Sequence, residues 1–190
     1  MSDKGGITRE ASVRLLEKHV KTDNLVKHCL ATEAIMRALA RRLGEDEEAW
    51  GAAGLLHDLD FEETKDNPQQ HGLRTAQTLA SEGVNSEVIE SIKAHNAEAL
   101  GIDRNTAFAH ALAAAETLTG LIVATALVYP DKKLASVKPG SITKRMKKKD
   151  FAWAVNRDII MECEQIGLSL PQFAELSLKA MQSISDDLDL

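Results

Sequence analysis

Cysteine, proline and aromatic residues are all scarce in this sequence. Its 190 residues include 2 cysteines and 4 prolines, and aromatic side chains make up 4% of the total. Cys29 and Cys163 do not amount to a disulfide framework, so we expect two reduced thiols and a cytoplasmic location. The first 24 residues contain no apolar run of signal-peptide length, which agrees with that expectation.

The sequence also lacks an excess of positive charge and an uninterrupted membrane-spanning run. The 23 Lys and Arg against 29 Asp and Glu give a net charge of −6, which is no strong signal for nucleic-acid binding. The longest stretch poor in charge, from Ala107 to Tyr129, contains Glu116 and His110. Because a carboxylate in the middle of a bilayer is costly, this stretch predicts a buried core helix and no membrane partner.

What is present is the composition of a globular protein. Apolar residues make up 44% and charged residues 27% of a length that suits one domain, 1–190. Apolar residues recur at helical spacing and strand signals are weak. We predict an all-α fold with a basic loop and helix in 131–150 and further helices over about 11–20, 23–44, 46–59, 67–83, 85–101, 107–129, 151–166 and after Pro171.

The informative residues are polar groups that share helix faces with apolar side chains. His28, His57 and His95 each lie on such a face. Glu116 is the only formal charge in its long apolar helix, and Asp58 follows a helix with two internal glycines, which predict a close backbone approach. A buried carboxylate needs a raised pKa or a cation. Taken singly, each residue also fits a hydrogen-bonded core position; taken together, they favour a shared metal ion.

The order of these residues resembles the HD-domain superfamily of metal-dependent phosphohydrolases. The resemblance is carried by LLHDLD at 55–60, a histidine about thirty residues upstream, QHG at 70–72, AHN at 94–96 and a downstream acid, and it covers about 20–130. The later stretch 120–158 is similar to the C-terminal half of small bacterial HD or HDIG-type hydrolases. The resemblance implies an HD-domain-like helical bundle with a C-terminal helical extension over about 131–190.

The resemblance also implies a set of site residues. His57 and Asp58 would be catalytic, and the metal ligands would be His28, His57, Asp58, His71, His95 and Glu116. His71 and His95 match the histidines that hold a second ion in binuclear members, so Asp58 would bridge the two ions. The sequence departs from the family pattern in two features: the motif is HDLD where many relatives have HDIG, and position 116 is Glu where the family normally has Asp.

The implied reaction is hydrolysis of a phosphate ester, of a nucleotide or another small phosphorylated metabolite, by a water molecule activated by one or two Mn, Fe, Co, Ni or Zn ions. The segment 131–157 has nine Lys or Arg against two acids. We expect substrate phosphate to be bound by Lys93, Lys144, Lys147 and Arg157. The acidic segment 60–67 is typical of a solvated loop; Asp60, Glu62 and Glu63 are alternatives for ordering water or acting as a general base.

Two other functions remain open from the sequence. The chain could be a non-catalytic protein that binds a nucleotide or a partner, which the glutamate at position 116 favours. Less expected is a di-iron oxygenase on the same scaffold, which would need all six ligands and iron. The oligomeric state is not indicated by any pattern in the sequence.

Overall fold

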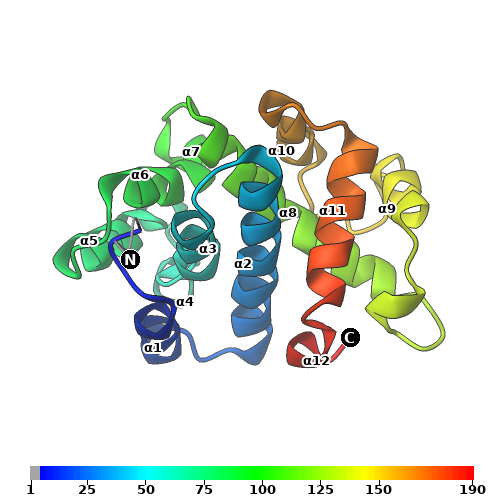
Figure 1. Cartoon of the computed structure of the whole chain (residues 1–190), viewed down its shortest axis with the longest axis horizontal. Helices are drawn as coiled ribbons and strands as arrows, with labels where there is room; N and C mark the ends of the chain where they lie inside the picture. Colours follow the sequence, from blue (N-terminus) through cyan, green and yellow to red (C-terminus); the bar gives the residue numbers. More distant parts are fainter. Residues whose placement is uncertain (1–4) are drawn as a thin grey trace.

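Every regular element in residues 5–190, the part of the chain that the computed structural model describes, is a helix (Figure 1). The N-terminal part contains α1 (Arg9–His19), α2 (Asp23–Leu43), α3 (Glu47–Leu56), α4 (Phe61–Thr64), the 3₁₀ turn η1 (Pro68–Gln70), α5 (Leu73–Ser81), α6 (Ser86–His95) and α7 (Ala97–Leu100). There follow α8 (Ala107–Leu127), η2 (Leu134–Ser136), α9 (Pro139–Met146), α10 (Arg157–Met161), η3 (Glu162–Ile166), α11 (Leu170–Gln182) and α12 (Ser185–Leu188). The predicted all-α fold is confirmed.

Two long helices, α2 and α8, form the centre of the molecule. In Figure 1, α1, α3, α5 and α6 lie on one side of α2, and α9, α11 and α12 lie on the other. The α2–α3 contact is the most extensive between helices. A Cβ added to Gly54 in α3 would lie 2.8 Å from the Thr32 carbonyl oxygen in α2, so only glycine allows the observed spacing. The predicted close backbone approach is confirmed at this glycine.

The helix α8 supplies much of the core. Leu112, Leu118, Leu121 and Ile122 are fully buried along it. Its length and composition alone would permit a membrane span, but 61% of its apolar window is buried inside the protein. That burial fits the predicted core helix, because apolar surface removed from water stabilises the fold wherever it packs.

Helix ends near the histidines differ from the sequence prediction. The helix α3 ends at Leu56, so His57 and Asp58 lie in the turn that follows it. The predicted helix start at Asn67 is wrong: Pro68–Gln70 forms a 3₁₀ turn, and α5 begins at Leu73. The reason is Gly72, which has a left-handed backbone (φ 84°) and separates the two elements.

The predicted helix over 151–166 is also wrong in its first part. Residues 147–156 form turns, and α10 begins only at Arg157. The Arg157 guanidinium donates hydrogen bonds to four backbone carbonyl oxygens of this segment, those of Lys148, Phe151, Ala152 and Val155. These bonds satisfy carbonyl groups that a continuous helix would have used internally.

Candidate metal centre

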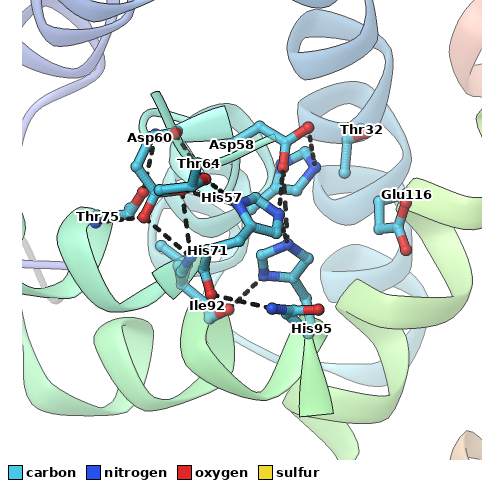
Figure 2. Close-up of polar contacts among 12 residues, drawn as sticks. Thr32, His57, Asp58, Asp60, Thr64, His71, Thr75, Ile92, His95 and Glu116 are labelled. Carbon is cyan, nitrogen blue, oxygen red and sulfur yellow. Dashed lines mark hydrogen bonds and ion pairs between the residues drawn. The ribbon is translucent and has the colours of Figure 1, made fainter. Parts of the chain in front are cut away.

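The histidine side chains converge from four separate parts of the chain. His28 lies on α2, His57 and Asp58 follow α3, His71 follows η1, and His95 ends α6. Figure 2 shows His57, His71 and His95 turned toward the Asp58 carboxylate. His57, Asp58, His71 and His95 lie at a helix end or in a turn, whereas His28 lies within α2.

His28 and His57 face each other through their Nε2 atoms, which are 3.1 Å apart. The His57 Nδ1–H donates to the Gly54 carbonyl oxygen at 2.9 Å. The Thr119 hydroxyl donates its only hydrogen to the Glu116 carbonyl oxygen, so it must accept from the His28 Nδ1–H at 2.9 Å. Because Nδ1 of each ring is used in these hydrogen bonds, Nε2 is the nitrogen that each ring turns toward the other.

His71 and His95 form a second pair with the same arrangement. Their Nε2 atoms are 2.9 Å apart. The His71 Nδ1–H donates to Asp60 Oδ1 at 2.7 Å, and the His95 Nδ1–H donates to the Ile92 carbonyl oxygen. All four imidazoles are thus fixed through Nδ1 by a backbone, hydroxyl or carboxylate acceptor, which is how metal-binding histidines are oriented in proteins.

The Asp58 carboxylate lies between the two pairs. Its Oδ2 is 3.7 Å from His28 Nε2 and 3.5 Å from His57 Nε2. Its Oδ1 is 3.2 Å from His71 Nε2 and 3.6 Å from His95 Nε2. Each oxygen of one carboxylate therefore completes a separate group of three ligand atoms, all within 4.8 Å of one another.

The donor set fits divalent cations. Two nitrogen ligands, each about 2.1 Å from an ion, are about 3.0 Å apart when they bind at right angles, and the two observed Nε2 separations are 3.1 and 2.9 Å. Facing lone pairs repel each other unless a proton or a cation lies between them. The buried His/Asp cluster is therefore compatible with a divalent metal site.

Burial and neighbouring charge prepare the ligands for a cation. Burial, with the nearby His28 and His95, lowers the pKa of His57 to about 3, so its Nε2 lone pair is free at neutral pH. Burial opposes ionisation of Asp58, but its histidine neighbours outweigh burial and hold its pKa well below the usual range. A neutral imidazole beside an ionised carboxylate is the combination that transition metals prefer.

His71 differs from His57 in its protonation, and we predict that this makes one metal site pH-dependent. Burial disfavours its charge, but hydrogen bonds to Asp58 and Asp60 prevail and raise the pKa of His71 to about 9. At neutral pH a proton therefore occupies the His71–His95 pair and must leave before a metal binds. Below pH 9 we expect affinity there to fall about tenfold per pH unit, as measured by chelator competition at pH 6.5, 7.5 and 8.5.

The His28–His57 pair provides the internal comparison for this prediction. Because His57 is neutral across the same range, an ion bound by this pair displaces no proton from His57. If the affinity for every bound ion were the same at the three pH values, the assignment of a proton to His71 would be wrong.

Asp60 and Thr119 are hydrogen-bonded to the rings of His71 and His28. The sequence pattern places Asp60 in a solvated loop and gives no signal for Thr119. The segment 60–67 is typical of a solvated loop, yet Asp60 is 4% exposed. Its carboxylate accepts hydrogen bonds from His71 Nδ1 and from the backbone N–H groups of Gly72 and Thr75. Asp60 thus orients His71 and cannot serve as a solvated general base. Glu62 accepts from the backbone N–H groups of Lys21 and Thr22 instead.

Glu116 lies beside the cluster but belongs to neither three-residue group. Figure 2 shows its carboxyl group on α8, next to the histidines and unconnected to them. Its Oε1 accepts a hydrogen bond from the Thr117 hydroxyl at 2.5 Å. The structure thus brings together five of the six predicted ligands, and the ligand role of Glu116 stays a prediction.

Replacement of Glu116 by glutamine is expected to stabilise the metal-free protein at neutral pH. Burial raises the pKa of Glu116, so ionisation of this carboxyl at higher pH costs folding free energy. Glutamine has the same shape and does not ionise. We expect a higher Tm for Glu116→Gln at pH 8 and a difference that shrinks as pH falls and the wild-type carboxyl becomes protonated.

The same variant tests the sixth ligand in the presence of metal. If Glu116 binds an ion, Glu116→Gln will lower metal affinity as well as raise the metal-free Tm. Unchanged affinity would limit the ligands to the five clustered residues. A Tm that falls in the metal-free protein would contradict the cost of ionising this carboxyl.

The predicted phosphate-binding residues are dispersed. Lys93 on α6 forms an ion pair with Glu90, and Lys144 and Lys147 are exposed on and just after α9. The Arg157 guanidinium donates hydrogen bonds to backbone carbonyl oxygens, and its contact with substrate phosphate stays a prediction. Within residues 5–190, no hydrogen bond or ion pair joins these four residues to the histidine pairs. Substrate binding by the three lysines stays a prediction.

The fold and the cluster together define an all-α protein with a buried His/Asp site suited to divalent metal. The model of the HD domain family matches residues 25–126, more than half of the chain, and the chain therefore belongs to this family. The matched range includes the five clustered residues and Glu116. The resemblance stated from the sequence is confirmed at the level of the family. A comparison with solved structures finds no match.

Proposed function

We propose that this HD-domain protein is a metal-dependent phosphohydrolase that cleaves a phosphate ester of a nucleotide or another small metabolite. One observation carries the proposal: the Asp58 carboxylate lies between two imidazole pairs and offers one oxygen to each. Two divalent cations held in this way are a common arrangement for in-line displacement at phosphorus. Membership of a family rich in such hydrolases supports the proposal.

Some residues of the chain would bind the metal ions, and others would orient the side chains that bind them. Divalent ions bound here would supply a water molecule of lowered pKa and would polarise a phosphoryl oxygen. The ligands would be His28, His57 and Asp58 for one ion and Asp58, His71 and His95 for the other. Asp60 and Thr119 keep the rings of His71 and His28 in the orientation that directs Nε2 inward.

Manganese, iron, cobalt, nickel and zinc all suit this donor set. The number of ions, one or two, and their identity belong to the proposal. The cytoplasmic location also stays a prediction; two buried free cysteines agree with a reducing compartment.

The proposal is tested by metal analysis followed by an activity screen. Protein purified without chelators is analysed for metal per chain, and nucleotides and simple phosphomonoesters are then offered with Mn²⁺, Co²⁺, Ni²⁺, Fe²⁺ or Mg²⁺. We expect bound metal and release of phosphate that His57→Ala abolishes. The control is His110→Gln, because His110 binds Glu162 away from the cluster.

The outcomes of this screen separate the functional classes. Bound metal with no hydrolysis of any ester would overturn the proposal, and iron with consumption of dioxygen would replace it by an oxygenase. Absence of metal would favour a non-catalytic binding protein. Hydrolysis that persists in His57→Ala would show that the reaction occurs elsewhere.

A further inference from the structure

A cleft of about 530 Å³ lies between α2, α8 and the turn after α12. Asn24, Lys27 and His28 line it from α2, and Thr119 and Gly120 line it from α8. The other lining residues are Asp189 and six aliphatic residues: Ala31, Val123, Ala124, Leu127, Leu188 and Leu190. One end of the cleft therefore lies against the His28 ring, and the rest of the cleft, called here the channel, has mainly aliphatic walls.

His28 is the most exposed histidine of the cluster, ahead of His71, whose side chain is 14% exposed. The His28 side chain is 24% exposed, whereas those of His57 and His95 are 1% and 5% exposed. Because His28 also lines the cleft, a ligand in the cleft has one end beside His28 and the rest along α8. The long axis of such a ligand would run along α8 from Thr119 toward Leu127.

The chemistry of the walls does not favour a nucleoside. No Phe, Tyr or Trp lines the cleft, so it offers no aromatic face on which a base could stack, and stacking is a major part of base recognition. Aliphatic walls favour an alkyl chain, because burial of each methylene contributes to binding.

The charge at the cleft limits the number of phosphate groups. Among the described residues, 5–190, Lys27 is the only Lys or Arg that lines it. Its ammonium group is already bound by Asp23 at 2.6 Å and by Asp189 at 2.7 Å. These ion pairs hold the C-terminal turn against α2 and leave no free cation for a diphosphate or triphosphate chain.

We propose that this cleft binds an aliphatic phosphate monoester, with its phosphate at the His28 end and its alkyl chain between α8 and the turn at Leu188. The proposal rests on the proposed phosphohydrolase function and names its substrate class. It also assigns Ala124 and Leu127 as residues that determine chain-length specificity.

Binding of hydrolysis-resistant phosphonates to the Mn²⁺-supplemented protein tests the cleft independently of activity. We compare methylphosphonate, hexylphosphonate and the phosphonate analogue of adenosine monophosphate, in which a methylene group replaces the ester oxygen, by calorimetry. Burial of a methylene should tighten binding about fourfold, so hexylphosphonate should bind more than about tenfold tighter than methylphosphonate even if only two methylenes are buried. The adenosine analogue should bind no tighter than methylphosphonate.

Variants of the channel wall provide the second readout. Ala124→Phe fills the channel and should remove the preference for hexylphosphonate. Leu127→Ser should weaken only the longer ligand, and because Leu127 is 49% exposed, this variant should fold. The control is Val128→Ser: Val128 is the next residue, is 55% exposed and does not line the cleft.

Equal affinity for methylphosphonate and hexylphosphonate would overturn the cleft proposal. Tighter binding of the adenosine analogue than of hexylphosphonate would also overturn it. So would a preference for hexylphosphonate that is unchanged in both Ala124→Phe and Leu127→Ser. Tight hexylphosphonate binding without hydrolysis of any ester would support the cleft and reject the proposed function. Hydrolysis of esters with no dependence on chain length would support the function and reject the cleft.

Discussion

Replacement of Asp58 by asparagine is expected to remove metal from both imidazole pairs and to abolish phosphate release. The carboxylate contacts one pair through Oδ2 and the other through Oδ1. An amide keeps one oxygen, puts an NH₂ group in place of the other, and carries no charge. One pair thus loses a ligand, and both lose the negative charge that offsets the ions. We expect affinity to fall by more than the 10–100-fold that loss of an outer-shell partner costs.

The measurement is metal per chain by elemental analysis, paired with a phosphomonoester assay. The matched control is Asp66→Asn, which removes one exposed carboxylate from the neighbouring acidic segment. Full metal content in Asp58→Asn would contradict the bridging position of the carboxylate. Loss of one ion with activity retained would show that a single pair performs the reaction.

The candidate ligands that can be recognised from the sequence are those that helix periodicity or a short motif indicates. His28 and His95 lie on apolar helix faces, where a 3.6-residue repeat makes an inward polar group visible. His57 and Asp58 are indicated both by helical spacing and by the LLHDLD motif, and the structure shows that they occupy a turn rather than a helix. Each of these predictions requires only the identity and spacing of residues that are close together in the sequence.

The contacts that sequence reasoning missed depend on irregular backbone or on distant partners. Asp60 is buried because Gly72 and Thr75 fold back over it, and no periodic pattern marks such a turn. Thr119 binds His28 across 91 positions of sequence, and its hydroxyl looks like any other on an apolar helix. The backbone carbonyl acceptors of Arg157 are a further example, because its charge alone does not reveal them.

Replacement of Gly54 by alanine is expected to be the most destabilising single-methyl change near the cluster. The new Cβ would lie 2.8 Å from the Thr32 carbonyl oxygen and 2.9 Å from the Glu33 backbone nitrogen. Backbone atoms cannot move aside as a side chain can, so α3 must shift away from α2. Overpacking of this kind costs about 1–3 kcal/mol, which chemical denaturation of the metal-free protein will measure.

The same shift should weaken metal binding, because the Gly54 carbonyl oxygen holds His57 Nδ1 at 2.9 Å. Gly51→Ala is the matched control: both positions gain about 1 kcal/mol of helix propensity from alanine, but the Gly51 Cβ would meet only side-chain atoms of Arg37. We expect Gly54→Ala to be the less stable of the two and to bind metal more weakly. Equal stability of the two variants would show that α2 and α3 have room between them, and the close contact would then not be what positions His57.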